Sequence, residues 1–130
     1  MNNFNIIKIQ NKLKDKNISA LIINRTDEFL NEYISPDAER LFWATNFSGS
    51  AGRAIVTQSS AILYVDGRYT FQAREQINTH QISLRHFSDF SRDLNKYFLK
   101  NECIALDPKL HSIEVVLQYI DLAAKNKCNL

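Results

Sequence analysis

The chain has 130 residues, of which 45% are hydrophobic and 23% are charged, and this mixture is typical of one globular domain that needs no disulfide bonds. The formal net charge of +2 is too small to indicate a nucleic acid as partner. No apolar run approaches the roughly 20 residues needed to cross a membrane, and residues 1–5 lack the order of a signal peptide. We therefore expect a single domain over residues 1–130, with a cytoplasmic location.

Cysteines and histidines would be the first residues to suggest a disulfide or a metal site. Cys103 and Cys128 are isolated in the sequence, and neither lies in a Cys-x-x-Cys motif. His80, His86 and His111 are far apart, and no two of them have the four-residue spacing of metal-binding pairs on a helix. We expect two free thiols and no metal-binding residue, with a disulfide between the two cysteines as the alternative.

The beginning of the chain predicts a helix followed by a buried strand. Ile6, Ile9 and Leu13 recur at helical spacing with lysines between them, which predicts an amphipathic helix that ends near Asn17. The short apolar run at 20–23 is typical of a strand that is buried on both faces. Such a strand is expected in the interior of a sheet.

A second helix and a tight loop are predicted after an irregular stretch at 24–33. Ser35 can cap this helix through its hydroxyl, and Pro36 suits the first helical position. The helix should end before Asn46. Residues 46–52 then form a loop that contains two of the three glycines of the chain.

The middle of the chain predicts a hairpin, a helix and a further strand. Residues 54–57 and 61–65 have the pattern of two strands joined by a short polar turn, which indicates an antiparallel hairpin. A turn at Asp66 leads to a helix over 68–77, which the Asp66 carboxylate can cap. The alternation of polar and apolar residues at 81–85 is typical of a half-buried strand.

The last third predicts two helices with a strand between them. Ser88 or Asp89 can cap the first helix, residues 103–106 form the strand, and Ser112 can cap the second helix. The predicted fold class is therefore α/β, with a mixed and mainly parallel sheet, one antiparallel hairpin and helices on both faces. Residues 128–130 have the pattern of a strand that begins, so we expect the natural chain to continue.

Residue chemistry alone indicates no convincing active site. The glycine-rich loop at 49–52 can cradle an anion, but a phosphate site is expected to open a helix, whereas this loop leads into a strand. A tight turn that needs small residues is the simpler interpretation. The carboxylate of Asp66 and the guanidinium of Arg68 could both take part in catalysis. Helix capping and charge pairing nevertheless explain these two residues better.

Three segments, in the same order along the chain, resemble the N-terminal domain of Xaa-Pro aminopeptidases (aminopeptidase P). They are YISPDAERLFWATNFSGSAG at 33–52, LYVDGRY at 63–69 and IALDPKLH at 104–111. Together they are more similar to the three-domain branch of that family than to prolidases or creatinases. Asn46 stands where the family usually has glycine, and asparagine tolerates the same left-handed backbone conformation. Arg53 stands where an apolar or small residue is common.

The resemblance implies a creatinase-type N-terminal domain whose parent enzyme acts through a part of the protein outside this chain. In the family, a C-terminal pita-bread domain holds two divalent metals, usually manganese, through two Asp, one His and two Glu. None of these ligands corresponds to a residue of this chain, so no catalytic or metal-binding residue is expected in it. The parent is implied to be a hydrolase that releases the N-terminal residue from peptides with proline second, and this domain alone to be inactive.

The resemblance also implies partners, namely the catalytic domain of the same polypeptide and a second copy of the full-length enzyme. The domain is expected to aid dimerisation and to shape substrate access. The residues expected at these boundaries or at the substrate entrance are Arg40, Phe47, Ser48, Gly49, Ser50, Asp66, Arg68 and Tyr69. Arg40 and Arg68 are candidates for salt bridges across a boundary, and the alternative is that both pair within this domain. The alternative functions are the N-terminal domain of an Xaa-Pro dipeptidase or a creatinase-type amidinohydrolase, and a stand-alone binding module.

Overall fold

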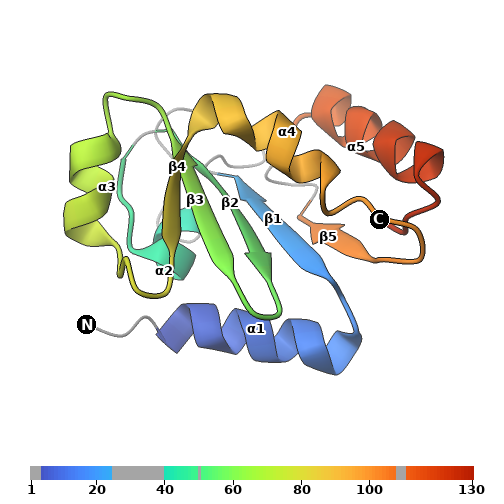
Figure 1. Cartoon of the computed structure of the whole chain (residues 1–130), viewed down its shortest axis with the longest axis horizontal. Coiled ribbons are helices and arrows are strands. Elements are labelled where there is room, and N and C mark those ends of the chain that lie inside the picture. The colour runs from blue at the N-terminus through green and yellow to red at the C-terminus, as the bar shows by residue number, and fades with distance from the viewer. Residues whose placement is uncertain (1–3, 25–39, 50, 108–110) are drawn as a thin grey trace.

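A computed structural model of the chain describes residues 4–24, 40–49, 51–107 and 111–130. The elements in these ranges are α1 (Phe4–Lys16), β1 (Ala20–Asn24), α2 (Arg40–Thr45), β2 (Arg53–Thr57), β3 (Ala61–Val65), α3 (Thr70–Gln76), β4 (Ser83–His86), the 3-10 helix η2 (Phe87–Asp89), α4 (Phe90–Asn95), β5 (Ile104–Leu106) and α5 (Ile113–Lys125) (Figure 1). The predicted alternation of strands and helices is thereby confirmed. None of the helices within these ranges combines the length and the apolar character that crossing a membrane requires.

The five strands form one sheet in the order β4-β3-β2-β1-β5. β1 pairs in parallel with β5, and β3 pairs in parallel with β4, whereas β2 runs antiparallel to both of its neighbours. Among the strands that the structure describes, β2 is therefore the only one that runs in the opposite direction. The predicted mixed, mainly parallel sheet is confirmed, and so is the hairpin of β2 and β3. A parallel bridge between Cys103 and Asn129 continues the sheet beside β5.

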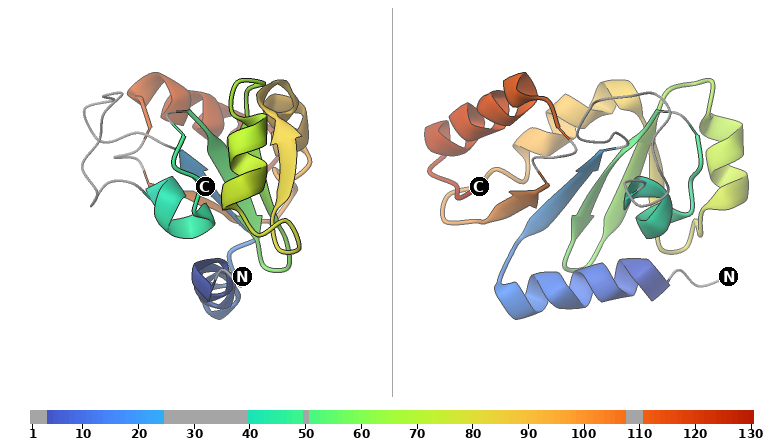
Figure 2. Two further views of the ribbon diagram at one scale, coloured as in Figure 1. Left: turned by 90° about the vertical axis from the view of Figure 1, so that its left-hand side faces the viewer. Right: turned by 180° about the vertical axis from the view of Figure 1, so that it is seen from behind.

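Helices cover both faces of the sheet, as Figure 2 shows from two further sides. Buried side chains of α1, α2 and α3 pack on one face, and those of α4 and α5 pack on the other. Successive side chains of a strand point to opposite faces, so β1 contributes Ile23 to the first cluster and Ile22 to the second. This explains the continuous apolar run at 20–23, because the strand is covered on both faces.

The first two helices end where the sequence predicts. α1 buries Ile6 and Leu13, and Asn17 follows it with a left-handed φ of 55° that ends the helix. α2 ends at Thr45, directly before Asn46. The predicted capping residues Ser35 and Pro36, and most of the predicted loop before them, lie outside the described residues.

The predicted start of α3 is wrong by two residues. The helix begins at Thr70, and its N-cap is Tyr69, which makes no capping hydrogen bond through its side chain. The Asp66 carboxylate instead closes the turn before the helix, where its Oδ1 accepts a hydrogen bond of 2.9 Å from the Arg68 backbone N–H. Two further residues of turn therefore separate β3 from α3.

Of the two caps predicted in the last third, one is confirmed in position alone and the other also by its hydrogen bond. Asp89, one of the two predicted alternatives, occupies the N-cap position of α4, but its side chain makes no capping hydrogen bond, and Ser88 lies in the 3-10 helix η2 that precedes α4. The side chain of His86 caps η2 instead, since its Nδ1 accepts a hydrogen bond of 3.1 Å from the Ser88 N–H. Ser112 caps α5 as predicted, because its Oγ accepts from the Val115 N–H at 3.2 Å.

Candidate functional site

Four of the predicted site residues lie in the loop at 46–52, which joins α2 to β2. Ser50 falls outside the described residues, and the other three are described. Asn46 opens the loop with a φ of 67°, which is the left-handed conformation expected at this position. Its side-chain amide donates a hydrogen bond of 2.9 Å to the backbone oxygen of Gln76, at the end of α3. The loop is thus fixed to α3 from its first residue onward.

Ser48 is exposed and makes the second connection between this loop and α3. Its backbone N–H donates to Oε1 of Gln76 at 2.9 Å, and its hydroxyl accepts from Nε2 of Gln76 at 2.7 Å and from Nε2 of Gln72 at 3.3 Å. The two glutamines are one turn apart on the helix, so both side chains reach the same loop. Sequence reasoning assigned them no role, and their spacing of four residues is the signal that could have found them.

The Phe47 side chain points into the domain, and Gly49 lies directly against its ring. The Phe47 side chain is only 1% exposed, and its ring meets the Tyr69 ring edge-on with the centroids 6.0 Å apart. A Cβ on Gly49 would lie 2.2 Å from Cζ of this ring. Phe47 therefore belongs to the core of this domain, which corrects its expected place at a boundary with another domain. The close contact also supports the interpretation of this loop as a tight turn that needs small residues.

Replacing Gly49 with alanine should lower the free energy of unfolding by about 1–3 kcal/mol, because the new Cβ overlaps a buried ring that cannot swing into solvent. Gly67→Ala is the matched control, since a Cβ on Gly67 meets no atom within 4 Å. The control should change the free energy of unfolding by less than about 0.5 kcal/mol. Urea unfolding measures both variants, and equal stability of Gly49→Ala and the unmodified chain would contradict this packing.

The turn after β3 holds three more of the predicted site residues, Asp66, Arg68 and Tyr69, next to one another. Arg68 donates from Nη2 to Oδ2 of Asp66 at 2.8 Å, and its Nε lies 3.3 Å from both oxygens of that carboxylate. The guanidinium also lies 5.2 Å from the centre of the Tyr69 ring. The hydrogen bond from the Arg68 side chain holds the pKa of the Asp66 carboxyl below its ordinary value. Arg68 thus pairs within the domain while its side chain remains largely exposed.

Arg40 likewise has an acidic partner within the domain. Its Nη1 lies 3.9 Å from Oδ2 of Asp107, the residue directly after β5. An exposed ion pair contributes only about 0.2–1 kcal/mol, so Arg40 and Arg68 can exchange these partners for others at small cost. The structure therefore shows the intradomain pairing that the sequence left as an alternative, on side chains that another domain can still reach.

Arg53, whose contacts the sequence left open, is stacked against two aromatic rings. Its Cζ lies 4.9 Å from the centre of the Phe87 ring and 5.0 Å from the centre of the Phe90 ring. The rings come from η2 and from the first residue of α4. The half-buried arginine covers apolar surface with its planar guanidinium and its aliphatic stem, so it takes the place of an apolar residue here.

Asp93 is a buried acidic residue of α4. Its Oδ2 accepts a hydrogen bond of 2.9 Å from the Tyr64 hydroxyl, and Nη1 of Arg85 lies 3.6 Å from the same oxygen. Lys96 and Arg92 approach Oδ1 at 3.6 Å and 3.7 Å. Burial raises the pKa of this carboxyl, but the Tyr64 hydrogen bond and the three positive charges outweigh burial, so the pKa lies below its ordinary value. The arrangement keeps a buried carboxylate charged and joins β3 to α4.

His111 is a second buried polar side chain that titrates, just before α5, in addition to the buried tyrosines Tyr64 and Tyr119 and the thiol of Cys128. Its Nδ1 lies 2.9 Å from the backbone oxygen of Asp107, and its ring meets Tyr119 with the centroids 6.0 Å apart. Burial lowers the pKa of this imidazole, so it is neutral at pH 7. Cys103 and Cys128 are both free thiols. Within the described ranges, no three His, Cys, Asp or Glu side chains gather to hold a metal ion.

A comparison with protein families finds the Creatinase/Prolidase N-terminal domain over residues 6–129. Among curated relatives, Xaa-Pro aminopeptidase 2 of Homo sapiens is 43% identical over 70 residues, which cover 54% of this chain and 10% of that protein. Aminopeptidase P1 of Lotus japonicus is 33% identical over 104 residues, which cover 78% of this chain and 16% of that protein. The chain therefore spans between 10% and 16% of the length of these two relatives.

Solved structures show the same fold at low identity. The X-prolyl aminopeptidase of Caenorhabditis elegans, described as a cytosolic enzyme with a di-nuclear active site, matches 99% of this chain and 24% of its own at a TM-score of 0.83 and 21% identity. The N-terminal domain of the cytoplasmic peptidase PepQ from Mycobacterium tuberculosis matches 99% of this chain and 92% of its own at a TM-score of 0.69 and 16% identity. At such identities the likeness shows the fold alone. The second structure also shows that a domain of this fold crystallises without the rest of its enzyme.

Proposed function

Because this chain belongs to the creatinase/prolidase N-terminal domain family, we propose that it is the non-catalytic N-terminal domain of a metal-dependent Xaa-Pro aminopeptidase. The observation that carries the proposal is the family match over 6–129 together with relatives that are themselves Xaa-Pro aminopeptidases. The parent enzyme releases the N-terminal residue from peptides in which proline is second. We place it in the cytoplasm, as is described for the enzyme of Caenorhabditis elegans.

The catalytic chemistry belongs, in this proposal, to another domain of the same polypeptide. Two divalent metal ions, manganese in our proposal, supply metal-assisted hydrolysis there. The described residues of this chain do not fit such a centre, because they bring no cluster of three metal-ligating side chains together. We therefore assign no residue of this chain to the metals and no step of the reaction to this domain.

This domain contributes surface rather than reactive groups. We propose that it contacts the catalytic domain and the second subunit of a dimer, and that it shapes the path by which peptides enter. The exposed members of the predicted set, Arg40, Ser48 and Arg68, are the residues that support this role. They lie on α2, on the loop after it and on the turn after β3, where they contact the half-buried polar side chains of Asp107, Gln76 and Asp66.

The complete polypeptide that contains this chain provides the test. Supplied with Mn²⁺, it should release free arginine from Arg-Pro-Pro, and a chelator should abolish the release. Arg-Ala-Ala is the control peptide and should remain intact, because the enzyme needs proline in second place. An Xaa-Pro dipeptidase would cleave Arg-Pro and spare Arg-Pro-Pro, so that result, or no cleavage of either peptide, would overturn the proposal.

A further inference from the structure

A groove of about 540 Å³ lies between the beginning of α1, α2 and the end of α3. Its lining includes Phe4, Trp43, Asn46, Glu75 and Asn78. We call it the Phe4–Trp43 groove, after the two aromatic residues that line it. None of the functions assigned above uses it.

The two aromatic side chains of this groove are unusually exposed for their size. Phe4 is 65% exposed and Trp43 is 49% exposed. They are nevertheless held in relation to each other, because the Asn5 side chain donates a hydrogen bond of 2.7 Å to the backbone oxygen of Trp43 and so joins α1 to α2. The bond from Asn46 to Gln76 joins the end of α2 to α3 in the same way. The groove is therefore formed before any ligand arrives, which lowers the entropic cost of binding.

Two polar groups stand out in a lining that also includes the side chains of Asn5, Asn46, Gln76, Asn78, Thr79 and His80. Within the part of the chain that the structure describes, the indole N–H of Trp43 has no hydrogen-bond partner, and the exposed Glu75 carboxylate has no ion-pair partner. Neither lysine nor arginine lines the groove. The groove thus presents two aromatic faces, a free N–H group and an unneutralised acid.

We propose that the Phe4–Trp43 groove binds a proline-containing peptide in the polyproline II conformation, with the free amino terminus of the peptide near Glu75. Polyproline II segments expose proline rings, which pack on aromatic faces, and backbone oxygens, which accept from an indole N–H. They are also ordered before binding, so they lose little entropy in a preformed groove. The α-ammonium group complements the single acid. The class of peptide rests on the proposed function, since an Xaa-Pro aminopeptidase meets peptides with proline second and a free amino terminus.

Fluorescence of this chain tests the proposal directly, because Trp43 is its only tryptophan. Titration with the peptide Arg-Pro-Pro-Pro-Pro-Pro should shift the emission of Trp43 with a saturable curve and a dissociation constant of about a millimolar. An analogue with alanine in place of every proline should bind at least about tenfold more weakly, because it lacks the rings and the preformed helix. Acetylation of the amino terminus should weaken binding severalfold, because the charge opposite Glu75 is lost.

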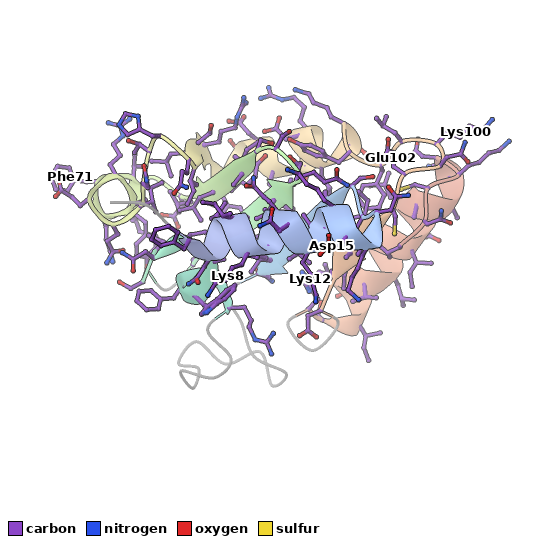
Figure 3. The ribbon with its side chains drawn as sticks, turned by 90° about the horizontal axis from the view of Figure 1, so that it is seen from below. Lys8, Lys12, Asp15, Phe71, Lys100 and Glu102 are labelled. Atoms are coloured by element: carbon purple, nitrogen blue, oxygen red, sulfur yellow. The ribbon has the colours of Figure 1, made fainter. Side chains whose placement is uncertain are left out.

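Variants of the groove locate the binding. Phe4→Ala should weaken binding at least about fivefold, and Phe4→Tyr, which keeps the ring, should preserve it. Glu75→Gln should remove the difference between the free and the acetylated peptide. Phe71→Ala is the matched control, because this side chain is 78% exposed on α3 and projects away from the rest of the molecule in Figure 3. Circular dichroism verifies that α1 persists in Phe4→Ala.

Three results of the peptide titrations would overturn the proposal. They are an unchanged Trp43 emission, an equal response to the alanine analogue, and an equal loss of binding in Phe71→Ala. Emission that depends on protein concentration without any peptide would also overturn it, because it would assign the groove to a second copy of the chain. Hydrolysis of Arg-Pro-Pro by the complete polypeptide without binding here defeats this inference alone. If the peptide binds in the groove but the complete polypeptide does not hydrolyse Arg-Pro-Pro, only the proposed function is refuted.

Discussion

Phe47→Ala should lower the free energy of unfolding of this domain by about 3–5 kcal/mol, the usual cost of removing a buried aromatic ring. The ring lies in the cluster between α1, α2, α3 and the sheet, and it touches the positions of two glycines. A cavity would remain there, because Gly49 and Gly52 have no side chains to fill it. Urea unfolding followed by circular dichroism measures the loss.

Phe71→Ala is the control for this experiment, since it removes the same ring from an exposed position. It should change the free energy of unfolding by less than about 0.5 kcal/mol. The comparison decides between two interpretations of Phe47. If Phe47→Ala kept its stability and impaired only the activity of the complete polypeptide, Phe47 would be the boundary residue that the sequence predicts, and its assignment to the core would fail.

Asp93→Ala should lower the free energy of unfolding by about 2–4 kcal/mol. The charged hydrogen bond with Tyr64 contributes about 1.5–3 kcal/mol, and each half-exposed cation adds a fraction of a kilocalorie. Asp89→Ala is the matched control four residues earlier in the chain, because among the described residues its carboxylate pairs with the exposed Arg92, at 3.2 Å. Asp89→Ala should lower the free energy of unfolding by no more than about 1 kcal/mol. An equal decrease in Asp89→Ala and Asp93→Ala would refute the special role of Asp93.

The same carboxylate should make the stability of the domain sensitive to acid. The pKa of Asp93 is lower in the folded chain than its ordinary value, so its contribution is complete above the ordinary pKa and is lost as the pH falls through the folded pKa. The difference in stability between the unmodified chain and Asp93→Asn should therefore be largest near neutral pH and should shrink toward about pH 2. A difference that stays constant over this range would mean that packing, and not charge, explains the effect.

Short apolar runs separated by polar turns were sufficient to predict the order of helices and strands. The run at 20–23 could be assigned to a strand buried on both faces, because each of its side chains meets one of two helical layers. The hairpin of β2 and β3 was predictable because only three residues separate its strands. In both cases the signal lies within a few consecutive residues, where the pattern of burial follows directly from the repeat of a strand.

Capping was harder to predict, because a cap depends on the path of the backbone around it. Ser112 could be identified since it directly precedes a regular helix. Asp66 was assigned to a helix that begins later than the sequence indicates, because a turn intervenes, and Ser88 lies inside a 3-10 helix in front of α4. Nothing in the side chains of these residues distinguishes the first turn of an α-helix from a tighter turn in front of it.

The contacts within the candidate site were even harder to predict from the sequence than the caps. The contacts of Ser48 with Gln72 and Gln76 join residues that are 24 and 28 positions apart, and they exist because α2 and α3 pack on one face of the sheet. The inward orientation of Phe47 has the same origin. The stacking of Arg53 on Phe87 and Phe90 instead depends on the opposite face, where α4 packs on the sheet. Motif resemblance singled out the segments at 33–52 and 63–69, but only the tertiary packing shows which of their described side chains are exposed.

The central claim is that this chain folds as a domain without catalytic residues of its own. Incubation of the purified chain with Mn²⁺ and Arg-Pro-Pro tests that claim most directly, with circular dichroism to show that the chain is folded. No release of arginine is expected, and elemental analysis after dialysis should find neither manganese nor zinc retained by the protein. Release of arginine by the chain alone, at a rate that depends on the metal, would contradict the claim.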